Sequence, residues 1–311
     1  MKAVVLHEYG GPSKLKYEEF EDPKPGSGEI LIRVQAVSLN PVDLKMRSGA
    51  AQERFPVSFP AILGRDVAGI VRELGPDVDS AKSGFKVGDR VFAVAHATYA
   101  ELCVVKASDL AHIPPANGDK TLDITTAAAV PLVSVTGDQL IRRAANVQPG
   151  QTIVLTGALG SVGRCALFAA LEIGAKVIAA VRKQQIDEAI SLGAIAAIDT
   201  DDDKSIASLG TVDAVADTVN HDVAAKLIAK VKPGGIFASV LGPPSNAALH
   251  PTIQVNAIMS APDSKTIVHY AEAIRDGKLK LPIDRIMPLA EAAEAQAIAE
   301  KGSAGKIILT A

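Results

Sequence analysis

The sequence predicts an α/β fold with a doubly wound parallel sheet, together with a second, β-rich domain. The prediction rests on one stretch of 30 residues, Gln151 to Ala180. Thr152 to Thr156 are apolar or β-branched, as in a buried parallel strand. A small-residue turn follows, then a helical run that ends at Gly174, and then a second buried strand from Lys176 to Val181. This stretch is one βαβ unit with a glycine-rich first turn.

The residues before about 124 are rich in strand patterns separated by turn signals. The expected strands are Lys2 to Leu6, Glu29 to Ser38, Ala68 to Leu74, Arg90 to Ala95 and Ala100 to Val105. Pro114-Pro115 followed by Asn117-Gly118-Asp119 indicates a boundary loop.

Alternation of strands and helices then continues to about Met259. The later strands are expected at Ala194 to Ile198, Val212 to Ala216, Ile236 to Val240 and Thr252 to Met259, with helices near Gln184 to Leu192, Asp222 to Lys230 and Ser264 to Arg275. A tail from Leu279 ends in a strand at Lys306 to Leu309 and is expected to rejoin the first domain. We therefore predict a β-rich domain of residues 1–124 and 265–311 and a dinucleotide-binding domain of residues 125–264.

Composition narrows the class of protein. A chain of 311 residues with 48% hydrophobic residues can build two large cores, which must consist of Ala, Val, Ile and Leu because aromatics make up only 4%. The net charge of -3 gives no reason to expect a nucleic-acid partner or an anionic membrane surface. Apolar runs are too short to span a membrane, and the N-terminus resembles a first strand rather than a signal peptide. We expect a cytoplasmic protein whose two cysteines, Cys103 and Cys165, are small buried residues.

The glycine-rich turn predicts a dinucleotide site. Small residues let the backbone approach a pyrophosphate, and the following helix N-terminus offers free N–H groups to its charge. The first glycine of the strict G-x-G-x-x-G pattern is replaced by Ala158, but the strand-turn-helix-strand context supports the assignment. The alternative is a tight turn that binds nothing. Because ligands bind at the carboxyl ends of parallel strands, the predicted cofactor contacts are Gly157, Ala158, Gly160, Ser161, Val162, Gly163, Thr218, Val219, Leu241 and Gly242.

The end of the second strand favours NADPH over NADH. NAD sites place a carboxylate there for the ribose hydroxyls. This chain instead has Val181 followed by Arg182 and Lys183, two cations that suit a 2′-phosphate. The alternative is that both are the solvated start of a helix.

Several segments resemble the medium-chain dehydrogenase/reductase superfamily over essentially the whole chain. They are Gly26 to Ile32, Asn40 to Asp43, Leu63 to Gly69, Val87 to Val91, the glycine-rich turn and Gly305 to Leu309. Within the superfamily, the chain is most similar to the zinc-independent, zeta-crystallin-like quinone oxidoreductases and related enone reductases. The resemblance implies a GroES-like β-rich domain and a Rossmann domain, with the cofactor in the cleft between them.

The residues argue against a catalytic zinc, which needs about three N, S or carboxylate ligands. Where zinc-dependent relatives have a Cys, this chain has Asn40, and where they have a His-Glu pair it has Arg65-Asp66. The third ligand position falls near Leu132, and a guanidinium does not deprotonate to bind a metal. The six histidines show no metal-binding spacing. Without a Lewis acid, reduction of a conjugated acceptor is a better prediction than alcohol oxidation.

The resemblance also implies roles for three side chains. Asn40 is expected beside the nicotinamide, where it hydrogen-bonds the cofactor ribose or the substrate carbonyl; it also suits turn initiation before Pro41. Lys45 is expected to bind the carbonyl oxygen and stabilise the developing enolate, or to contact the cofactor. The alternative for Lys45 is an ordinary surface lysine. Thr136 matches a position near the nicotinamide carboxamide.

These observations favour an NADPH-dependent reductase of quinones or α,β-unsaturated carbonyl compounds. Two alternatives remain: an enoyl-thioester reductase, and a dinucleotide-binding redox-sensing or structural protein with little turnover. Thr252 to Met259 resembles an edge strand that pairs across a two-fold axis, so a homodimer is expected.

Overall fold

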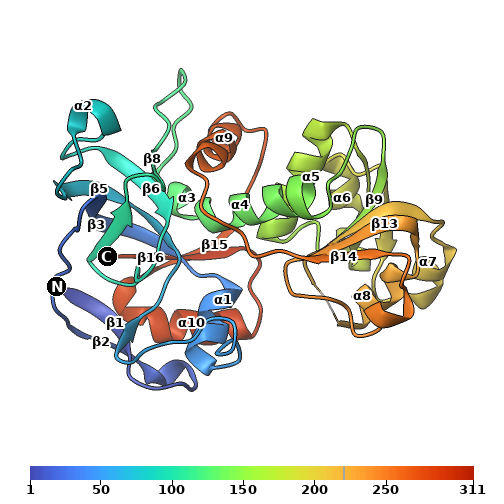
Figure 1. Cartoon of the computed structure of the whole chain (residues 1–311), viewed down its shortest axis with the longest axis horizontal. Coiled ribbons are helices and arrows are strands. Elements are labelled where there is room, and N and C mark those ends of the chain that lie inside the picture. Colours follow the sequence, from blue (N-terminus) through green and yellow to red (C-terminus); the bar gives the residue numbers. More distant parts are fainter. Residues whose placement is uncertain (220) are drawn as a thin grey trace. The chain divides into compact units, whose positions relative to one another are not determined.

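Residues 1–219 and 221–311 are described by the computed structural model, and they fall into two units (Figure 1). Unit 1 consists of Met1–Leu132 and Pro262–Ala311, and unit 2 consists of Val133–Ala261. The predicted division therefore needs a correction, since residues 125–132 and 262–264 pack with unit 1. The physical reason is that the helix α3 (Ile124–Ala128) contacts β3 and β5 of unit 1 and that the Leu132 amide donates to Asp66 Oδ1 at 2.7 Å.

Unit 1 is built on two β-sheets. Its strands are β1 (Lys2–Leu6), β2 (Leu15–Glu19), β3 (Glu29–Ser38), β4 (Ala61–Ile62), β5 (Asp66–Leu74), β6 (Arg90–Val94), β7 (Leu102–Lys106), β8 (Leu110–His112), β15 (Ile283–Pro288) and β16 (Lys306–Thr310). The larger sheet has the order β15-β16-β3-β5-β6-β8, with β7 also paired to β3, and the smaller has the order β2-β1-β4. The strand β16 is thus antiparallel to β3, with Ile308 beside Ser38 and Thr310 beside Ala36.

Helices cover these sheets. They are α1 (Pro41–Ser48), α2 (Ser80–Ser83), α3, α9 (Ser264–Arg275) and α10 (Ala292–Glu300), with short 3₁₀ turns at Pro12–Lys14 and Leu289–Glu291. The helix α4 (Pro131–Gln139) begins in unit 1 and continues in unit 2, where a π-helical turn follows at Leu140–Ala144.

Unit 2 is a parallel sheet flanked by helices. Its strands are β9 (Thr152–Thr156), β10 (Lys176–Val181), β11 (Ala196–Asp199), β12 (Val212–Asp217), β13 (Val231–Ser239) and β14 (Gln254–Ala257), and its further helices are α5 (Ser161–Ile173), α6 (Ile186–Ser191), α7 (Asp203–Ser208) and α8 (His221–Ile228), with 3₁₀ turns at Lys183–Gln185 and Ala247–Leu249. The order β11-β10-β9-β12-β13-β14 is that of a Rossmann domain, read from the third strand through the first to the sixth. The predicted fold class is confirmed.

The predicted helix starts lie close to the observed ones, whereas the bounds of two strands differ. β13 begins at Val231, earlier than predicted, and β14 covers only Gln254–Ala257 because the residues before it form a turn in which the Ile253 amide bonds to His250 O. At Asn40 the only local structure expected was the start of a turn before Pro41, and the helix α1 was not among the predicted helices. Pro41 at its first position and Asp43 in its first turn are, however, ordinary features of a helix start.

The cores have the expected composition. Buried Val, Ile and Leu of β3, β5 and β6 fill unit 1, and α5 packs against its sheet through small residues such as Ala166 and Ala170. Cys103 and Cys165 are both buried, as predicted, and burial raises the pKa of the Cys103 thiol to about 12.

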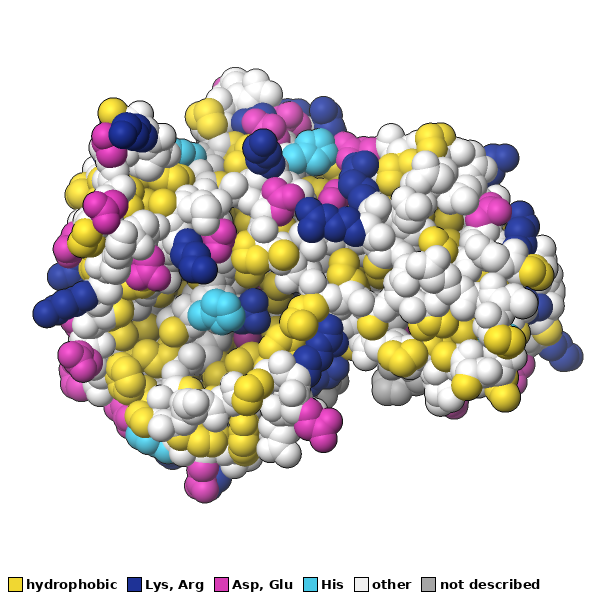
Figure 2. Space-filling model, viewed as in Figure 1, with side chains coloured by type: hydrophobic (Ala, Val, Ile, Leu, Met, Phe, Trp, Pro, Cys, Tyr) yellow, Lys and Arg dark blue, Asp and Glu magenta, His cyan; other side chains and the backbone are white. Residues whose placement is uncertain are grey.

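The surface shows mixed charge. On the face in Figure 2, Lys and Arg side chains are interspersed with Asp and Glu rather than gathered in a patch of one sign. None of the helices in the described part of the chain is long and apolar enough to cross a membrane.

Candidate functional site

The carboxyl ends of β9 and β12 form the switch point of the Rossmann sheet. These two strands are neighbours, but the chain leaves β9 toward β10 on one side and leaves β12 toward β13 on the other. Ligands of doubly wound sheets bind outside this point. Gly157 follows β9 here, and Thr218 and Val219 follow β12. The structure therefore brings together residues that are 61 positions or more apart in the sequence.

Two glycines make the turn after β9 possible. Gly157 has φ of 60°, and a Cβ on it would lie 2.6 Å from Thr218 Oγ1. A Cβ on Gly163 would lie 2.0 Å from the carbonyl oxygen of Gly157. The residue in the left-handed backbone conformation is thus Gly157. Ala158 is buried and does not adopt that conformation. This explains why alanine is tolerated at the first position of the strict glycine motif.

The N-terminus of α5 is open to an anion. Gly160 caps the helix without a side chain, and its carbonyl accepts from the Arg164 amide at 2.8 Å. The amides of Ser161, Val162 and Gly163 have no hydrogen-bond partner among residues 1–219 and 221–311. Free amides at a helix N-terminus bind phosphate groups well, so the turn fits the pyrophosphate of a dinucleotide.

Arg164 supports this turn and was missed by the sequence reading. The side chain is 6% exposed, its Nε donates to Leu159 O at 3.0 Å, and its guanidinium pairs with Glu188 of α6. The signal in the sequence was an arginine within an otherwise apolar helix.

A buried carboxylate, Asp217, joins the ends of three strands. It accepts hydrogen bonds from the Thr156 hydroxyl at 2.8 Å, the Ser239 hydroxyl at 2.7 Å and the Val219 amide at 3.2 Å. Thr156 also accepts from the Thr218 amide at 2.8 Å. Because these groups link β9, β12 and β13, they fix the positions of the residues that follow each strand.

The other predicted cofactor residues of unit 2 lie at or near this edge. Arg182 and Lys183 come directly after β10, both are exposed, and neither cationic group has an ion pair within the described ranges. Leu241 and Gly242 follow β13, and the Leu241 amide donates to Ser239 Oγ at 3.0 Å. Thr136, on α4, is hydrogen-bonded to Ser260 at 2.9 Å between the two hydroxyl oxygens.

In unit 1, Asn40 lies at the start of α1 and is 3% exposed. Its Nδ2 donates to Asp66 Oδ2 at 2.8 Å and, more weakly, to Ser38 O at 3.3 Å. Its Oδ1 accepts from the Lys306 ammonium at 2.7 Å. Asn40 is therefore held in a buried polar network.

Asp43 is a second buried carboxylate of unit 1. Its Oδ2 accepts from the backbone amide of Asn40 at 2.9 Å and from the Tyr99 hydroxyl at 3.1 Å, while Oδ1 has no hydrogen-bond partner in the described structure. Burial raises the pKa of Asp43 to about 7, the nearby charge of Asp66 adds to this, and the two hydrogen bonds act against it. Burial also raises the pKa of Tyr99 well above its usual value.

Lys45 is exposed on α1. Its ammonium has no ion pair or hydrogen bond to the residues that the structure describes. An unpaired cation on a helix that begins at Asn40 is available to a ligand, although exposure alone is the common state of a lysine.

The residues at the expected metal position do not fit a zinc ion. Asn40, Asp66 and the amide of Leu132 do converge there, but the cation among them is the ammonium of Lys306, which lies 3.7 Å from Asp66 Oδ2. Residues 1–219 and 221–311 contain no cluster of three or more His, Cys, Asp or Glu side chains able to hold a metal. An amide already committed to an ammonium and a carboxylate leaves no ligand set for zinc.

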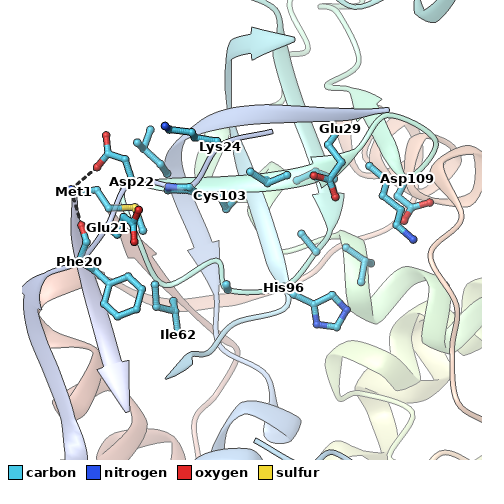
Figure 3. Close-up of a pocket in the computed structure, with 18 of the residues that line it drawn as sticks. Met1, Phe20, Glu21, Asp22, Lys24, Glu29, Ile62, His96, Cys103 and Asp109 are labelled. Carbon is cyan, nitrogen blue, oxygen red and sulfur yellow. Dashed lines mark hydrogen bonds and ion pairs between the residues drawn. The ribbon is translucent and has the colours of Figure 1, made fainter. Parts of the chain in front are cut away.

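A hollow of about 940 Å³ also opens on unit 1 (Figure 3). Met1, Phe20, Asp22, His96 and Asp109 lie around it, and the Met1 ammonium is bonded to Asp22 and to Phe20 O. Burial, followed by the charge of Arg65, lowers the pKa of His96. Neither Asn40 nor Lys45 lines this hollow, so it is separate from the residues predicted to act on the substrate.

Comparison with known proteins agrees with this arrangement. Residues 26–115 match the family model described as "Alcohol dehydrogenase GroES-like domain", and residues 192–309 match the model described as "Zinc-binding dehydrogenase". The chain is 29% identical to the chloroplastic quinone-oxidoreductase QR1 of Triphysaria versicolor, over 99% of this chain and 98% of the relative. It is 30% identical to the acryloyl-coenzyme A reductase of Sulfurisphaera tokodaii, over 60% of each chain.

Solved structures with the same fold include quinone oxidoreductases. That of Coxiella burnetii superposes with a TM-score of 0.87 at 27% identity, covering 100% of this chain and 99% of the other. The mycobacterial protein Rv1454c, complexed with NADPH, superposes with a TM-score of 0.84 at 26% identity and covers 100% of both chains. With the Rossmann order of unit 2 and the GroES-like match in unit 1, these likenesses show that the chain belongs to the medium-chain dehydrogenase/reductase superfamily of oxidoreductases.

Proposed function

We propose that this protein is an NADPH-dependent reductase of quinones or α,β-unsaturated carbonyl compounds that works without a metal ion. The observation that carries the proposal is the glycine-rich turn at the switch point, where, among the residues that the structure describes, three helix amides have no partner and two cations without an ion pair follow the neighbouring strand. An open helix N-terminus suits a pyrophosphate, and the cations suit the additional phosphate of NADPH. The NADPH complex of a structural neighbour and the names of the relatives support this proposal.

The residues of unit 2 would hold the cofactor. The amides of Ser161, Val162 and Gly163 would bind the pyrophosphate, and Arg182 and Lys183 the 2′-phosphate. The remaining contacts would come from Gly157, Ala158, Gly160, Thr136, Thr218, Val219, Leu241 and Gly242. When bound, reduced nicotinamide supplies the hydride for the reaction.

The residues of unit 1 would act on the acceptor. The Lys45 ammonium would bind the carbonyl oxygen and stabilise the negative charge that develops there, with the proton coming from Lys45 or water. Asn40 would orient the cofactor ribose or the acceptor carbonyl through its weakly bound Nδ2 hydrogen. Neither role requires a metal.

Cofactor preference is the first test. The double variant Arg182→Ala/Lys183→Ala should raise the KM for NADPH by about 10- to 100-fold, because charge-assisted contacts to a phosphate contribute about 1.5–3 kcal/mol. The KM for NADH should stay the same. The matched control is Lys176→Ala, since Lys176 is an exposed lysine at the opposite end of β10. Equal loss with both cofactors would contradict the assignment of the two cations.

Catalysis is the second test. Consumption of NADPH is followed with 1,4-quinones, short enones and an enoyl-CoA thioester. Lys45→Ala should lower kcat by about 100-fold if the ammonium stabilises the developing charge. Lys82→Ala, which removes an exposed lysine of α2, is the control. Turnover that Lys45→Ala does not change would discard this role, and tight NADPH binding without turnover of any acceptor would favour the redox-sensing or structural alternative.

An enoyl-thioester reductase is the second candidate, because one relative is an acryloyl-coenzyme A reductase. A kcat/KM for the CoA thioester far above those for quinones and free enones would establish it.

A homodimer is part of the proposal, since β14 lies at the edge of the described sheet and has a strand only on its β13 side. Pairing of two such edges would cover the unpaired backbone groups.

A further inference from the structure

An ammonium group is enclosed in unit 1. Lys306 is the first residue of β16, and it is only 5% exposed. Its Nζ donates to Asn40 Oδ1 at 2.7 Å and to Leu39 O at 2.9 Å, and it lies 3.7 Å from Asp66 Oδ2. Lysine is rarely buried, because an ammonium that leaves water needs a counter-charge and further hydrogen bonds. Here both are supplied by residues around Asn40.

The two charges hold the Asn40 amide at its opposite ends. The cation of Lys306 is on the oxygen, and the carboxylate of Asp66 is 2.8 Å from the nitrogen. Turning the amide over would place its NH₂ group against the ammonium and its oxygen against the carboxylate, which are two repulsive contacts. The ion pair therefore sets the orientation of this amide, and the backbone carbonyl of Ser38, which accepts from Nδ2 at 3.3 Å, favours the same orientation.

The same contacts leave one hydrogen of Nδ2 available. The contact between Nδ2 and Ser38 O is 3.3 Å long, against 2.8 Å for the contact to Asp66. A cation on the amide oxygen withdraws electron density from the nitrogen and makes its hydrogens better donors. A second acceptor would compete only with the weaker of the two bonds.

We propose that Lys306, together with Asp66, is a positioning residue that orients and polarises Asn40, so that the amide presents its second Nδ2 hydrogen to an acceptor atom of the bound cofactor or substrate. This inference rests on the proposed function only for the identity of that acceptor. The orientation of the amide is a property of the protein alone and is measured separately.

The test uses two variants that both lack the charges of Lys306 and Asp66 and that differ in whether residue 306 can donate a hydrogen bond to Asn40. Lys306→Met alone would leave Asp66 buried without its cation, so the variants are Lys306→Met/Asp66→Asn and Lys306→Gln/Asp66→Asn, which remove both charges. The glutamine retains a donor for Asn40 Oδ1, whereas the methionine does not. Lys280→Met, at an exposed lysine, is the control. Thermal midpoints, side-chain amide NMR signals of ¹⁵N-asparagine protein and steady-state kinetics are measured for each; Asn40→Ser assigns the Asn40 signal.

We expect the methionine double variant to lose the Asn40 amide signal of the wild type and to show at least a tenfold lower kcat, while the glutamine double variant, which keeps a donor for Asn40 Oδ1 but not the charge, retains the signal and has a kcat between those of the methionine variant and the wild type. Equal kcat and unchanged amide signals in both double variants would overturn the proposal and leave the ion pair a purely structural one.

If either double variant does not fold, the proposal can still be tested on the wild-type protein. Its Asn40 amide hydrogens must exchange with water far more slowly than those of the exposed Asn117, and fast exchange would overturn the proposal. If wild type reduces no acceptor, the proposed function fails, and the NMR result still decides whether Lys306 orients Asn40.

Discussion

Each unit of this protein contains a fully buried aspartate at the end of a strand where function is proposed, but the two are stabilised differently. In unit 2, Asp217 accepts from the hydroxyls of Thr156 and Ser239 and from the backbone amide of Val219. In unit 1, Asp66 accepts from a hydroxyl, a side-chain amide and a backbone amide, and also faces the ammonium of Lys306. Asp217 connects three strands of one sheet, whereas Asp66 connects the neighbouring strands β3, β5 and β16 and also binds Asn40 and Leu132, which lie outside that sheet.

The difference shows what each network does. Backbone hydrogen bonds already align β9, β12 and β13, and the hydrogen bonds of Asp217 fix the ends of these strands. Asn40 and Leu132 lie outside the sheet that contains Asp66 and Lys306, and a buried ion pair that is hydrogen-bonded to both segments specifies one arrangement of them. Such a pair is costly to break because removing one partner leaves a buried charge uncompensated.

Replacement of each carboxylate by its amide should give the largest difference. Asp66→Asn should destabilise the protein by about 3–5 kcal/mol, since Lys306 then lacks its counter-charge. Asp217→Asn should cost only about 1 kcal/mol, because an asparagine can keep hydrogen bonds to Thr156 and Ser239. Urea unfolding at pH 7 measures both. Similar losses in the two variants would mean that the charge of Lys306 contributes nothing to stability.

Asp43 provides a pH-dependent version of the comparison, since it is buried like Asp66 but has one unsatisfied oxygen. Its pKa is raised from 3.8 to about 7, so the folded state binds a proton that the unfolded state has lost between these two values. The stability contributed by the protonated form is fully present below pH 3.8 and is lost as the pH rises through 7.

Asp43→Asn removes this loss of stability at rising pH, because an asparagine side chain does not ionise. The stability of the variant relative to wild type should therefore rise between about pH 4 and 7, by at most about 4 kcal/mol. The exposed Asp119→Asn should show no such trend. Urea unfolding across this pH range checks the prediction, and a difference that does not vary with pH would show that Asp43 ionises normally.

The serines that donate to the two carboxylates should give the smallest difference between the two units, in the opposite order to the aspartates. Ser38→Ala should cost about 1 kcal/mol, because Asp66 retains its amide donors and Lys306. Ser239→Ala should cost about 2 kcal/mol, since the Leu241 amide also loses its acceptor. Thermal unfolding of both variants measures the difference, and a larger loss in Ser38→Ala would reverse this ranking of the networks.

The sequence by itself determined the Rossmann unit and the edge of its sheet at which we propose that the cofactor binds. Runs of Val, Ile and Ala that alternate with helical segments indicate buried parallel strands. A turn from Gly157 to Gly163 between a strand and a helix has few other conformations. The placement of Arg182 and Lys183 also followed from the sequence, because the residue after a strand lies at that strand's carboxyl end. These inferences were local, and they depended on backbone geometry that neighbouring residues specify.

Only the tertiary structure decided what surrounds Asn40. Lys306 lies 266 residues from Asn40 in the sequence, and a lysine before an apolar strand has the pattern of an ordinary exposed residue. The antiparallel pairing of β16 with β3 brings it inward, where Asp66 and Asn40 compensate its charge. Burial of a charged side chain depends on partners from distant segments, and no local pattern contains that information.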